Sequence, residues 1–330
     1  MPKPFFSIII PFFNRSATLS RAIVSVQAQT FENWELILVD DASSDSSVDI
    51  AKAAASADPR IKVLTNAQNQ ERCRSRNLGI NLATGQYICF LDSDDYHLPQ
   101  HLSLLYAFLE KTGFPTAFLF TKAWNEDAYG NREERDCPDF VESDSIRYFI
   151  LHTVNPQRWC VHATLIKEVQ FDPEVPICED MDWTLRIAAR GAPILELKER
   201  TTVYVAYPRS FTHGDPQKWE KELAALKAIF LRPELRALLP SSACRLRKSA
   251  CHYHLSIKSW EKQSPASFFH HAIRSFILCP KGYNGRTNKS LLVMAMYVLP
   301  LLGPILKRSI GGVKAVLGKT QMGTKKVRMD

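Results

Sequence analysis

The sequence has no closely spaced cysteines, no phosphate-binding glycine motif and no tract of low complexity. Its eight cysteines are scattered and no two form a CxxC pair, which argues against a structural zinc site and predicts free, mostly buried thiols in the cytoplasm. The absence of GxxxxGK[ST] and of a GxGxxG after the first apolar run argues against a P-loop nucleotidase and a dinucleotide-dependent dehydrogenase. The opening residues MPKPFFSIII lack a small-residue cleavage site, so we expect no secretory signal peptide there.

Positive charge is concentrated at one end of the 330-residue chain. The net charge is +8, yet residues 281–330 hold ten lysines and arginines against a single acid, Asp330. This tail therefore carries +9, and residues 1–280 carry about −1. No interleaving of aromatic and basic residues supports nucleic-acid binding. A basic tail of this kind favours contact with the anionic inner face of a plasma membrane.

An uncharged run, SLLVMAMYVLPLLGPIL, occupies residues 290–306 of the tail. A membrane-spanning helix needs about 20 apolar residues, whereas this run is shorter and contains Pro300, Gly303 and Pro304. We therefore expect a segment that rests in the lipid headgroup region rather than one that crosses the bilayer. The alternative is a pair of helices packed on the rest of the protein, with a solvated basic end.

The first 125 residues alternate short apolar runs with segments of helical periodicity. Strands are predicted at residues 7–10, 36–39, 61–64 and 87–91, and helices at residues 17–27, 46–57, 72–83 and 99–111. Because uninterrupted apolar strands alternate with helices, the pattern predicts a mostly parallel sheet flanked by helices, that is, an α/β fold.

The pattern changes twice farther along the chain. Weaker strands are predicted at residues 116–122, 163–167 and 195–207, and helices at residues 143–151 and 180–190. From about residue 215 the sequence is helical, with predicted helices at residues 218–231, 240–259 and 264–278. We therefore expect a first domain over residues 1–215 and a helical, basic C-terminal region over residues 216–330, whose helices are candidates for a homodimer contact.

Polar residues follow three of the predicted strands: Asn14, the pair Asp40-Asp41, and Asp92-Ser93-Asp94-Asp95. Ligands bind where the strands of a parallel sheet end, so these residues are expected at one site. Asp92 and Asp94 are two residues apart and would face the same way. Two carboxylates without a soft ligand nearby suit Mg²⁺ or Mn²⁺, which also takes substrate phosphate oxygens. The alternative is that these acids cap the helix predicted from Pro99, the expected role of Asp95.

Arg72 and Arg76 lie four residues apart on one face of a predicted helix. Arginine pairs with phosphate through two parallel hydrogen bonds, so this face is a candidate for holding a diphosphate. The alternative is a solvated charged face with no ligand.

Four segments resemble, in order and spacing, the family 2 glycosyltransferases. They are FSIIIPFFN (residues 6–14), SVQAQTFENWELILVDDASSD (residues 25–45), RCRSRNLGINLATGQYICFLDSDD (residues 72–95) and CED (residues 178–180). The resemblance covers roughly residues 5–210. It implies a GT-A fold, a nucleotide-sugar donor that is most often a UDP-sugar, Mn²⁺ or Mg²⁺ as cofactor, and inversion of the anomeric carbon.

The resemblance also implies roles for individual residues in the donor site. Asp92-Ser93-Asp94 matches the DxD motif of the family, with Asp92 at the ribose or sugar and Asp94 on the metal. Asp41 would bind the nucleotide base, and Pro11 and Phe13 lie in the loop that packs on that base. Asn14, at the end of the same segment, is a further candidate for donor binding.

Two departures from the family pattern lie close to this site. The family commonly has tyrosine where this chain has Phe13, so a hydroxyl contact to the nucleotide is missing. It often has a glycine in the stretch occupied here by Gln70-Glu71, so the loop before Arg72 is expected to differ.

A second acidic cluster, Glu179-Asp180-Met181-Asp182, opens the helix predicted at residues 180–190. Asp180 matches the position of the family's general base, which would remove a proton from the acceptor hydroxyl. Glu179 and Asp182 are neighbours that would tune or replace it. The alternative is an acidic first turn that stabilises the helix through its dipole.

Four weaker candidates remain. His213 would reach the diphosphate or the metal, and His162 would line the acceptor side. Trp159 and Trp183 are candidates for stacking on a sugar ring, with core packing as the alternative. A lone histidine is more often structural.

These patterns together predict a metal-dependent, inverting hexosyltransferase. It would move a sugar to a saccharide or lipid-linked saccharide acceptor in cell-surface polysaccharide biosynthesis, at the cytoplasmic face of the membrane. One alternative is a transferase that builds a polyprenyl-phosphate sugar with the same donor site. Another is a non-catalytic scaffold that binds nucleotide-sugars or saccharides.

Overall fold

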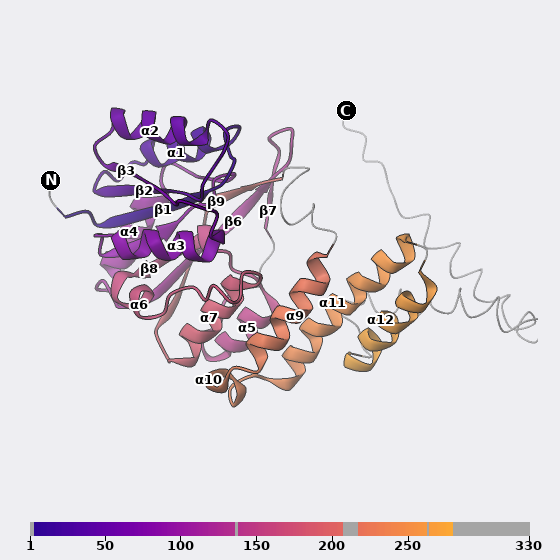
Figure 1. Ribbon diagram of the computed structural model, residues 1–330. Helices are drawn as coiled ribbons and strands as arrows, with labels where there is room; N and C mark the ends of the chain where they lie inside the picture. Colours follow the sequence, from indigo (N-terminus) through magenta and orange to yellow (C-terminus); the bar gives the residue numbers. More distant parts are fainter. Residues whose placement is uncertain (1–2, 136–137, 207–216, 263, 280–330) are drawn as a thin grey trace, which may run out of the picture. The chain divides into compact units, whose positions relative to one another are not determined.

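The computed structural model describes residues 3–135, 138–206, 217–262 and 264–279 (Figure 1). By Cα proximity the chain forms two compact units, residues 1–247 and residues 248–330. The first unit contains the sheet and the helices around it, up to α10 (Pro233–Arg236). The domain division expected at residue 215 stays a prediction.

Four parallel strands form one half of the sheet, as the sequence predicts. Their order is β3 (Ile61–Thr65), β2 (Trp34–Asp40), β1 (Phe6–Phe12) and β4 (Tyr87–Phe90). Every residue of β2 and β4 is buried, as expected for strands that are covered on both faces. Figure 1 shows β1, β2 and β3 with the helices α1 (Leu19–Gln27), α2 (Ser47–Ala57) and α3 (Glu71–Leu82), which connect the four strands.

The two faces of this half-sheet bury different side chains. Ile8 of β1 belongs to one core cluster with Ile23 of α1 and Leu105 of α4 (His101–Lys111). Ile9 points to the opposite face, where a Cβ on Gly79 of α3 would lie 2.5 Å from Ile9 Cγ2. Only glycine lets α3 approach β1 this closely. The close packing fixes α3, which carries the two arginines predicted to hold a diphosphate, against the sheet.

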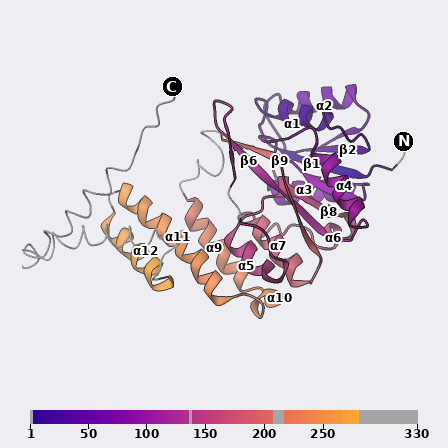
Figure 2. The same cartoon turned by 180° about the vertical axis from the view of Figure 1, so that it is seen from behind.

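The other half of the sheet mixes parallel and antiparallel strands. The order continues from β4 through β8 (Trp159–His162), β6 (Phe118–Glu126) and β9 (Ile194–Val205) to β5 (Tyr96–His97). β8 is antiparallel to β4 and β6, whereas the long strands β6 and β9 are parallel and lie side by side in Figure 2. β7 (Arg132–Glu134) pairs with the end of β6. The α/β prediction is confirmed, and strictly parallel pairing holds for the first four strands.

Two local predictions are wrong. Residues 163–167, predicted as a strand, form α6 (Ala163–Glu168), because the strand lies one segment earlier in β8. The ring of His162 accepts the N–H of Thr164 and so marks the start of that helix. Asp95 does not cap α4, which begins after Gln100 without a side-chain cap, because Asp95 is bonded elsewhere.

The other described helices agree with the predicted helical segments. They are α5 (Ser145–Leu151), α7 (Glu179–Ala189), α9 (Lys218–Phe230), α11 (Ser241–Glu261) and α12 (Pro265–Leu278), with short 3-10 turns at Glu142–Asp144 and Pro156–Arg158. Within the residues that the structure describes, no helix is both long and apolar enough to cross a membrane. The apolar run at residues 290–306 lies outside the described residues.

The described cysteines agree with the prediction of free thiols. In this part of the chain none forms a disulfide, and Cys73, Cys89, Cys160 and Cys251 are buried. Cys137 lies outside the described residues.

Candidate active site

A pocket of about 230 Å³ opens where β1, β2 and β4 end, the position at which parallel sheets bind ligands. All residues predicted to bind the donor line it except Asn14, namely Pro11, Phe13, Asp41, Arg72, Arg76, Asp92, Ser93 and Asp94. Its wall also includes residues that no sequence motif singled out, namely Arg15, Asn69, Glu71 and Ser75. Folding therefore gathers strand ends that are far apart in the sequence.

Asn14 does not line the pocket but ties two loops together. Its N–H donates to Ser43 Oγ at 3.0 Å, and its Oδ1 accepts the N–H of Ser44 at 2.8 Å. Its backbone has a left-handed φ of 51°, which asparagine adopts more readily than most residues. Asn14 thus shapes the loop that presents Pro11 and Phe13 to the pocket.

Asp41 organises the loop that leads into α3. It is buried, and its Oδ1 accepts hydrogen bonds from Asn66 Nδ2 at 2.8 Å and from the N–H of Gln70 at 2.9 Å. The next residue, Glu71, has a φ of 68°, in the region that favours glycine. This is the stretch in which family 2 glycosyltransferases often have a glycine, so the backbone keeps a glycine-like shape at a cost of about 1–2 kcal/mol.

Asp92 and Asp94 have different positive partners. Asp92 Oδ1 accepts a hydrogen bond from Arg76 at 2.9 Å. The Asp94 carboxylate lies 3.8 Å from Arg15 Nη2, and its backbone carbonyl accepts a hydrogen bond from Arg21. Both carboxylates remain on the pocket wall.

Asp95 belongs to the scaffold rather than to the pocket. Its carboxylate accepts hydrogen bonds from Gln157 Nε2 at 2.7 Å and from the N–H of Val205 at 2.9 Å. Burial raises the pKa of Asp95 well above its ordinary value. Asp95 therefore fastens the end of β9 to the turn that presents Asp92 and Asp94.

The charge on Asp94 suits a bound cation. Burial and the neighbouring Asp92 raise the pKa of Asp94, while Arg15 opposes the shift. A divalent cation would relieve this repulsion, and Mg²⁺ or Mn²⁺ accepts carboxylate oxygens together with water and substrate phosphates. Since no group of three or more potential protein ligands gathers among the described residues, water and phosphate oxygens would complete the coordination. His213 lies outside the described residues.

Asp180, the predicted base, lies in the first turn of α7 and is 8% exposed. Its Oδ1 accepts the N–H of Met181 at 2.7 Å, and its Oδ2 lies 3.4 Å from Asn155 Nδ2. Burial, followed by the charge of Glu179, raises the pKa of Asp180 from 3.8 to about 7. A carboxylate whose pKa lies near neutrality is suited to proton exchange at ordinary pH.

Arg76 connects the two acidic clusters. It is 2% exposed, and its two terminal nitrogens donate to Asp92 Oδ1 and Glu179 Oε1, each at 2.9 Å. Arg72 lies 3.5 Å from the same Glu179 oxygen. Because the terminal nitrogens of Arg76 contact the protein's own carboxylates, the geometry indicates a bridge within the site rather than a direct ligand of phosphate.

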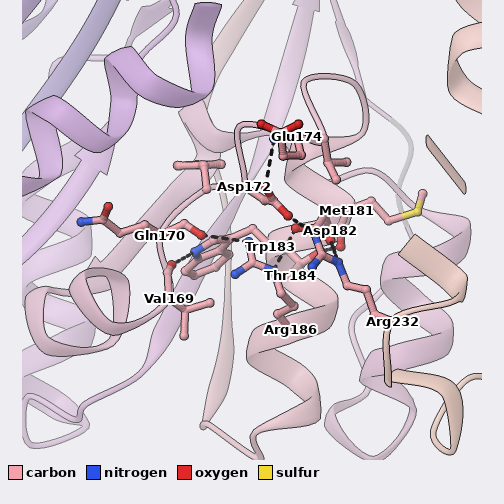
Figure 3. A network of polar contacts seen from close by, with 12 residues as sticks. Val169, Gln170, Asp172, Glu174, Met181, Asp182, Trp183, Thr184, Arg186 and Arg232 are labelled. Carbon is pink, nitrogen blue, oxygen red and sulfur yellow. Dashed lines mark hydrogen bonds and ion pairs between the residues drawn. The ribbon is translucent and has the colours of Figure 1, made fainter. Parts of the chain in front are cut away.

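Asp182 is not brought to the pocket. It is fully buried, and its two oxygens accept hydrogen bonds from Arg186 Nε at 2.8 Å and Arg232 Nε at 2.6 Å (Figure 3). Burial raises the pKa of Asp182, and the two arginines oppose that shift. Its contacts indicate a structural anchor for α7.

The weaker candidates that the structure describes are also in structural positions. The indole rings of Trp159 and Trp183 are fully buried and stack on each other with centroids 4.5 Å apart. His162 pairs in register with Tyr87 at the start of β4, whereas the pocket lies beyond the end of that strand. His162 therefore lies at the other end of β4 from the donor pocket, and its part on the acceptor side stays a prediction.

Known proteins resemble this chain in sequence. Residues 7–165 match the family model for glycosyl transferase family 2. The putative colanic acid biosynthesis glycosyl transferase WcaA of Escherichia coli (strain K12) is 31% identical over 216 residues, which cover 65% of this chain and 75% of that protein. The UDP-Glc:alpha-D-GlcNAc-diphosphoundecaprenol beta-1,3-glucosyltransferase WfgD of Escherichia coli is 42% identical over 98 residues, 30% of this chain and 38% of that protein.

Solved structures resemble it in fold. The crystal structure of S. aureus TarS 1-349 in complex with UDP-GlcNAc superposes with a TM-score of 0.60 at 19% identity, covering 84% of this chain and 82% of that one. At this identity the likeness concerns the fold, and it confirms the predicted architecture. The family match and the coverage of WcaA confirm the resemblance carried by the motifs: the chain belongs to glycosyl transferase family 2.

Proposed function

We propose that the chain transfers a sugar, with inversion, from a UDP-sugar to a hydroxyl of a saccharide or lipid-linked saccharide during assembly of a cell-surface polysaccharide. The observation that carries the proposal is one buried arginine, Arg76, that joins an acidic pocket at the strand ends to Glu179. Glu179 is adjacent to Asp180, whose pKa is raised to about 7. The names of WcaA and WfgD support the process and the acceptor class, and the UDP-GlcNAc complex of TarS supports the donor.

The donor side of the reaction belongs to the pocket. We assign Asp41 to the nucleotide base and Phe13 to packing on that base, because both line the pocket and Phe13 is 44% exposed. Asp92 and Asp94 would hold a divalent cation, with His213 as a further proposed ligand. Such a cation supplies Lewis-acid stabilisation of the charge on the leaving diphosphate. Arg76 keeps Asp92 oriented toward this task through its hydrogen bond.

We assign the acceptor side of the reaction to residues of α7. An acceptor hydroxyl must lose its proton as it attacks the anomeric carbon, and Asp180 is proposed to take that proton. Its pKa of about 7 means that a large share is deprotonated at neutral pH while the carboxylate is still basic enough to act. Glu179 supports this tuning, because its charge is the second cause of the raised pKa.

We expect UDP-sugars to raise the melting temperature of the protein more with Mn²⁺ than without it. The Asp94→Asn variant should lose the Mn²⁺-dependent part of the shift, because one negatively charged metal ligand is removed while the rest of the pocket is kept. Asp49→Asn, on the exposed face of α2, is the matched control and should behave as the unmodified protein. UDP and its sugars binding equally well with and without Mn²⁺ would contradict the metal assignment.

We also propose that the C-terminal region contacts an anionic membrane surface at the cytoplasmic side. The tail over residues 281–330 carries +9. The described helix α12 adds exposed apolar side chains at Ile273 (46%), Phe276 (37%) and Ile277 (66%). Apolar side chains beside basic charge are the combination that binds the surface of anionic bilayers.

The full-length protein is expected to sediment with phosphatidylserine-containing liposomes and much less with neutral ones. Replacing four tail lysines by glutamine should release most of the bound protein, since each basic residue near the surface contributes about 1 kcal/mol; these are Lys314, Lys319, Lys325 and Lys326. The matched control replaces four exposed lysines of the first unit, Lys52, Lys111, Lys221 and Lys227. Equal recovery of both variants in the pellet would contradict the proposed contact between the tail and the membrane.

A further inference from the structure

Arg232, just before α10, contacts two acidic residues, Asp172 in the segment before α7 and Asp182 in the first turn of α7. Its Nε donates to Asp182 Oδ1 at 2.6 Å, and a terminal nitrogen donates to Asp172 Oδ2 (Figure 3). The Asp182 side chain is fully buried and that of Arg232 is 21% exposed, so the carboxylate of this ion pair is shielded from water. Arg232 lies 67 residues beyond the region matched by the family model, which ends at residue 165.

Residues 169–172, which lie before α7, are also hydrogen-bonded to that helix. Asp182 also accepts from Arg186 Nε at 2.8 Å, and Arg186 donates onward to the carbonyl of Gln170 at 2.9 Å. Trp183 Nε1 donates to the carbonyl of Val169. Residues 169–172 and the first turns of α7 therefore form one polar network. Arg232, between α9 and α10, joins this network from a later part of the chain.

This network also reaches α3, the helix whose Arg76 lines the donor pocket. Asn77 of α3 exchanges two hydrogen bonds with the backbone of Phe171, at 2.8 and 3.0 Å. The ring of Phe171 lies 5.3 Å from the guanidinium of Arg76. A shift of residues 169–172 would thus be transmitted to the arginine that bridges Asp92 and Glu179.

The carboxylate of Asp180 makes one short hydrogen bond among the contacts described, and that bond is local. Its close hydrogen bond is to the N–H of the adjacent residue Met181, and Asn155 stands at 3.4 Å. Cys178, at the N-cap of α7, has a left-handed φ of 60° and makes no side-chain cap bond. The position of Asp180 therefore depends on the position of the first turn of α7, which Asp182 anchors two residues later.

We infer that Arg232 is a positioning residue for Asp180, and that the segment from α9 to α10 thereby completes the catalytic unit. The inference rests on the proposed function, because it assigns Arg232 a part in placing the base. A base must lie within about 2.6–3.2 Å of the proton it removes. A misplacement of about 1 Å costs on the order of 10²-fold in rate.

Loss of the Arg232 cation also leaves Asp182, two residues after Asp180, with one positive partner fewer. Asp180 faces Glu179 on its own helix, Arg76 from α3 and Arg247 from α11. Without Arg232, Asp182 keeps Arg186 as its ion-pair partner on α7. The negative potential at Asp180 then increases, so the pH at which the base becomes active moves upward.

The test compares Arg232→Gln with the unmodified full-length protein in steady-state transfer from a UDP-sugar, at temperatures below the melting point of each. We expect kcat to fall roughly tenfold to 10²-fold with the KM for the donor unchanged, and the acid limb of the pH profile to move to higher pH. Arg232→Lys keeps the cation and should leave the acid limb in place, with an intermediate kcat. Arg236→Gln, exposed on the same short helix, is the matched control and should change neither.

A kcat of Arg232→Gln within about twofold of the unmodified protein, at whatever melting temperature, would overturn the inference, since the expected loss is roughly tenfold or more. Should Arg232→Gln not fold, Arg232→Lys decides: a lower kcat at unchanged donor KM supports the inference, and an unchanged kcat overturns it. Absence of transfer by the unmodified protein across donors and acceptors would instead remove the proposed function, and this inference with it.

Discussion

The Asp180→Asn variant is expected to lose roughly 10²–10⁴-fold in kcat, the range that a general base contributes. Asparagine keeps the size of the side chain and its contact with Met181 but cannot accept the proton of the acceptor hydroxyl. Donor binding should persist, because Asp180 does not line the donor pocket. Steady-state kinetics together with calorimetric titration of UDP measures both quantities on the same preparation.

The pH dependence of the unmodified protein supplies an independent check on Asp180. Since the pKa of this carboxylate is raised to about 7, kcat/KM should rise with pH through neutrality. In Asp180→Asn the residual rate should lack this rise. The folded protein also bears the cost of ionising a buried carboxylate above its ordinary pKa of 3.8, a cost that asparagine removes, so the variant should be at least as stable as the parent at pH 8.

Near-full turnover by Asp180→Asn would contradict the role of base and favour a different acceptor. A phosphate oxygen needs little help to attack, so a transferase that builds a polyprenyl-phosphate sugar would tolerate the change. Asp49→Asn, exposed on α2, controls for the substitution itself. A variant that loses UDP binding along with kcat would indicate that Asp180 acts through the donor pocket.

The donor half of the fold could be predicted from the sequence because its elements are locally specified. The apolar runs that form β1, β2, β3 and β4 alternate with amphipathic segments, and strands buried on both faces need that pattern. Parallel strands then bring Asp41, Asp92 and Asp94 to one edge, which is why the donor residues could be placed.

The second half of the sheet could not be predicted in this way. β8 has only four residues and pairs antiparallel with both neighbours, so its position depends on strands distant in sequence. The adjacent residues 163–167 are apolar enough to resemble a strand, yet His162 starts a helix there. Short elements are set by tertiary contacts that a local pattern does not contain.

The ion pairs of the site could not be predicted from the sequence for a related reason. A spacing of four residues shows that Arg72 and Arg76 share a helix face but not which carboxylates meet that face. The Glu179 partner of Arg76 is 103 residues away, and the Arg232 partner of Asp182 is 50 residues away in a region expected to form a different domain. The pattern therefore indicated where positive charge lies but not that it stabilises the acidic clusters.

The largest stability loss is expected at Arg76. Arg76→Met removes a guanidinium that is 2% exposed from between Asp92 and Glu179. Glu179, which is 7% exposed, then keeps Arg72 at 3.5 Å, and Asp92 loses its arginine partner. Breaking a buried ion pair from one side costs about 3–5 kcal/mol, because the remaining charge stays desolvated. Chemical denaturation of the variant should show this loss in the free energy of unfolding.

Arg74→Met on the same helix is the matched control for Arg76→Met. Its guanidinium is 3.8 Å from Glu174, and the two side chains are 52% and 86% exposed. An exposed pair of this kind contributes about 0–1 kcal/mol, so the control should lose little. The contrast between two arginines on one helix therefore reports burial and bridging rather than helix propensity, which is similar for both positions.

Arg76→Met should also change the pH dependence of turnover in a specific direction. Arg76 is also one of the groups that hold the pKa of Asp180 down, so any residual turnover should need a higher pH. A stability loss equal to that of Arg74→Met, or a pH profile of turnover that does not move, would mean that the two acidic clusters do not need their bridge. The donor and acceptor sides of the site would then be electrostatically independent.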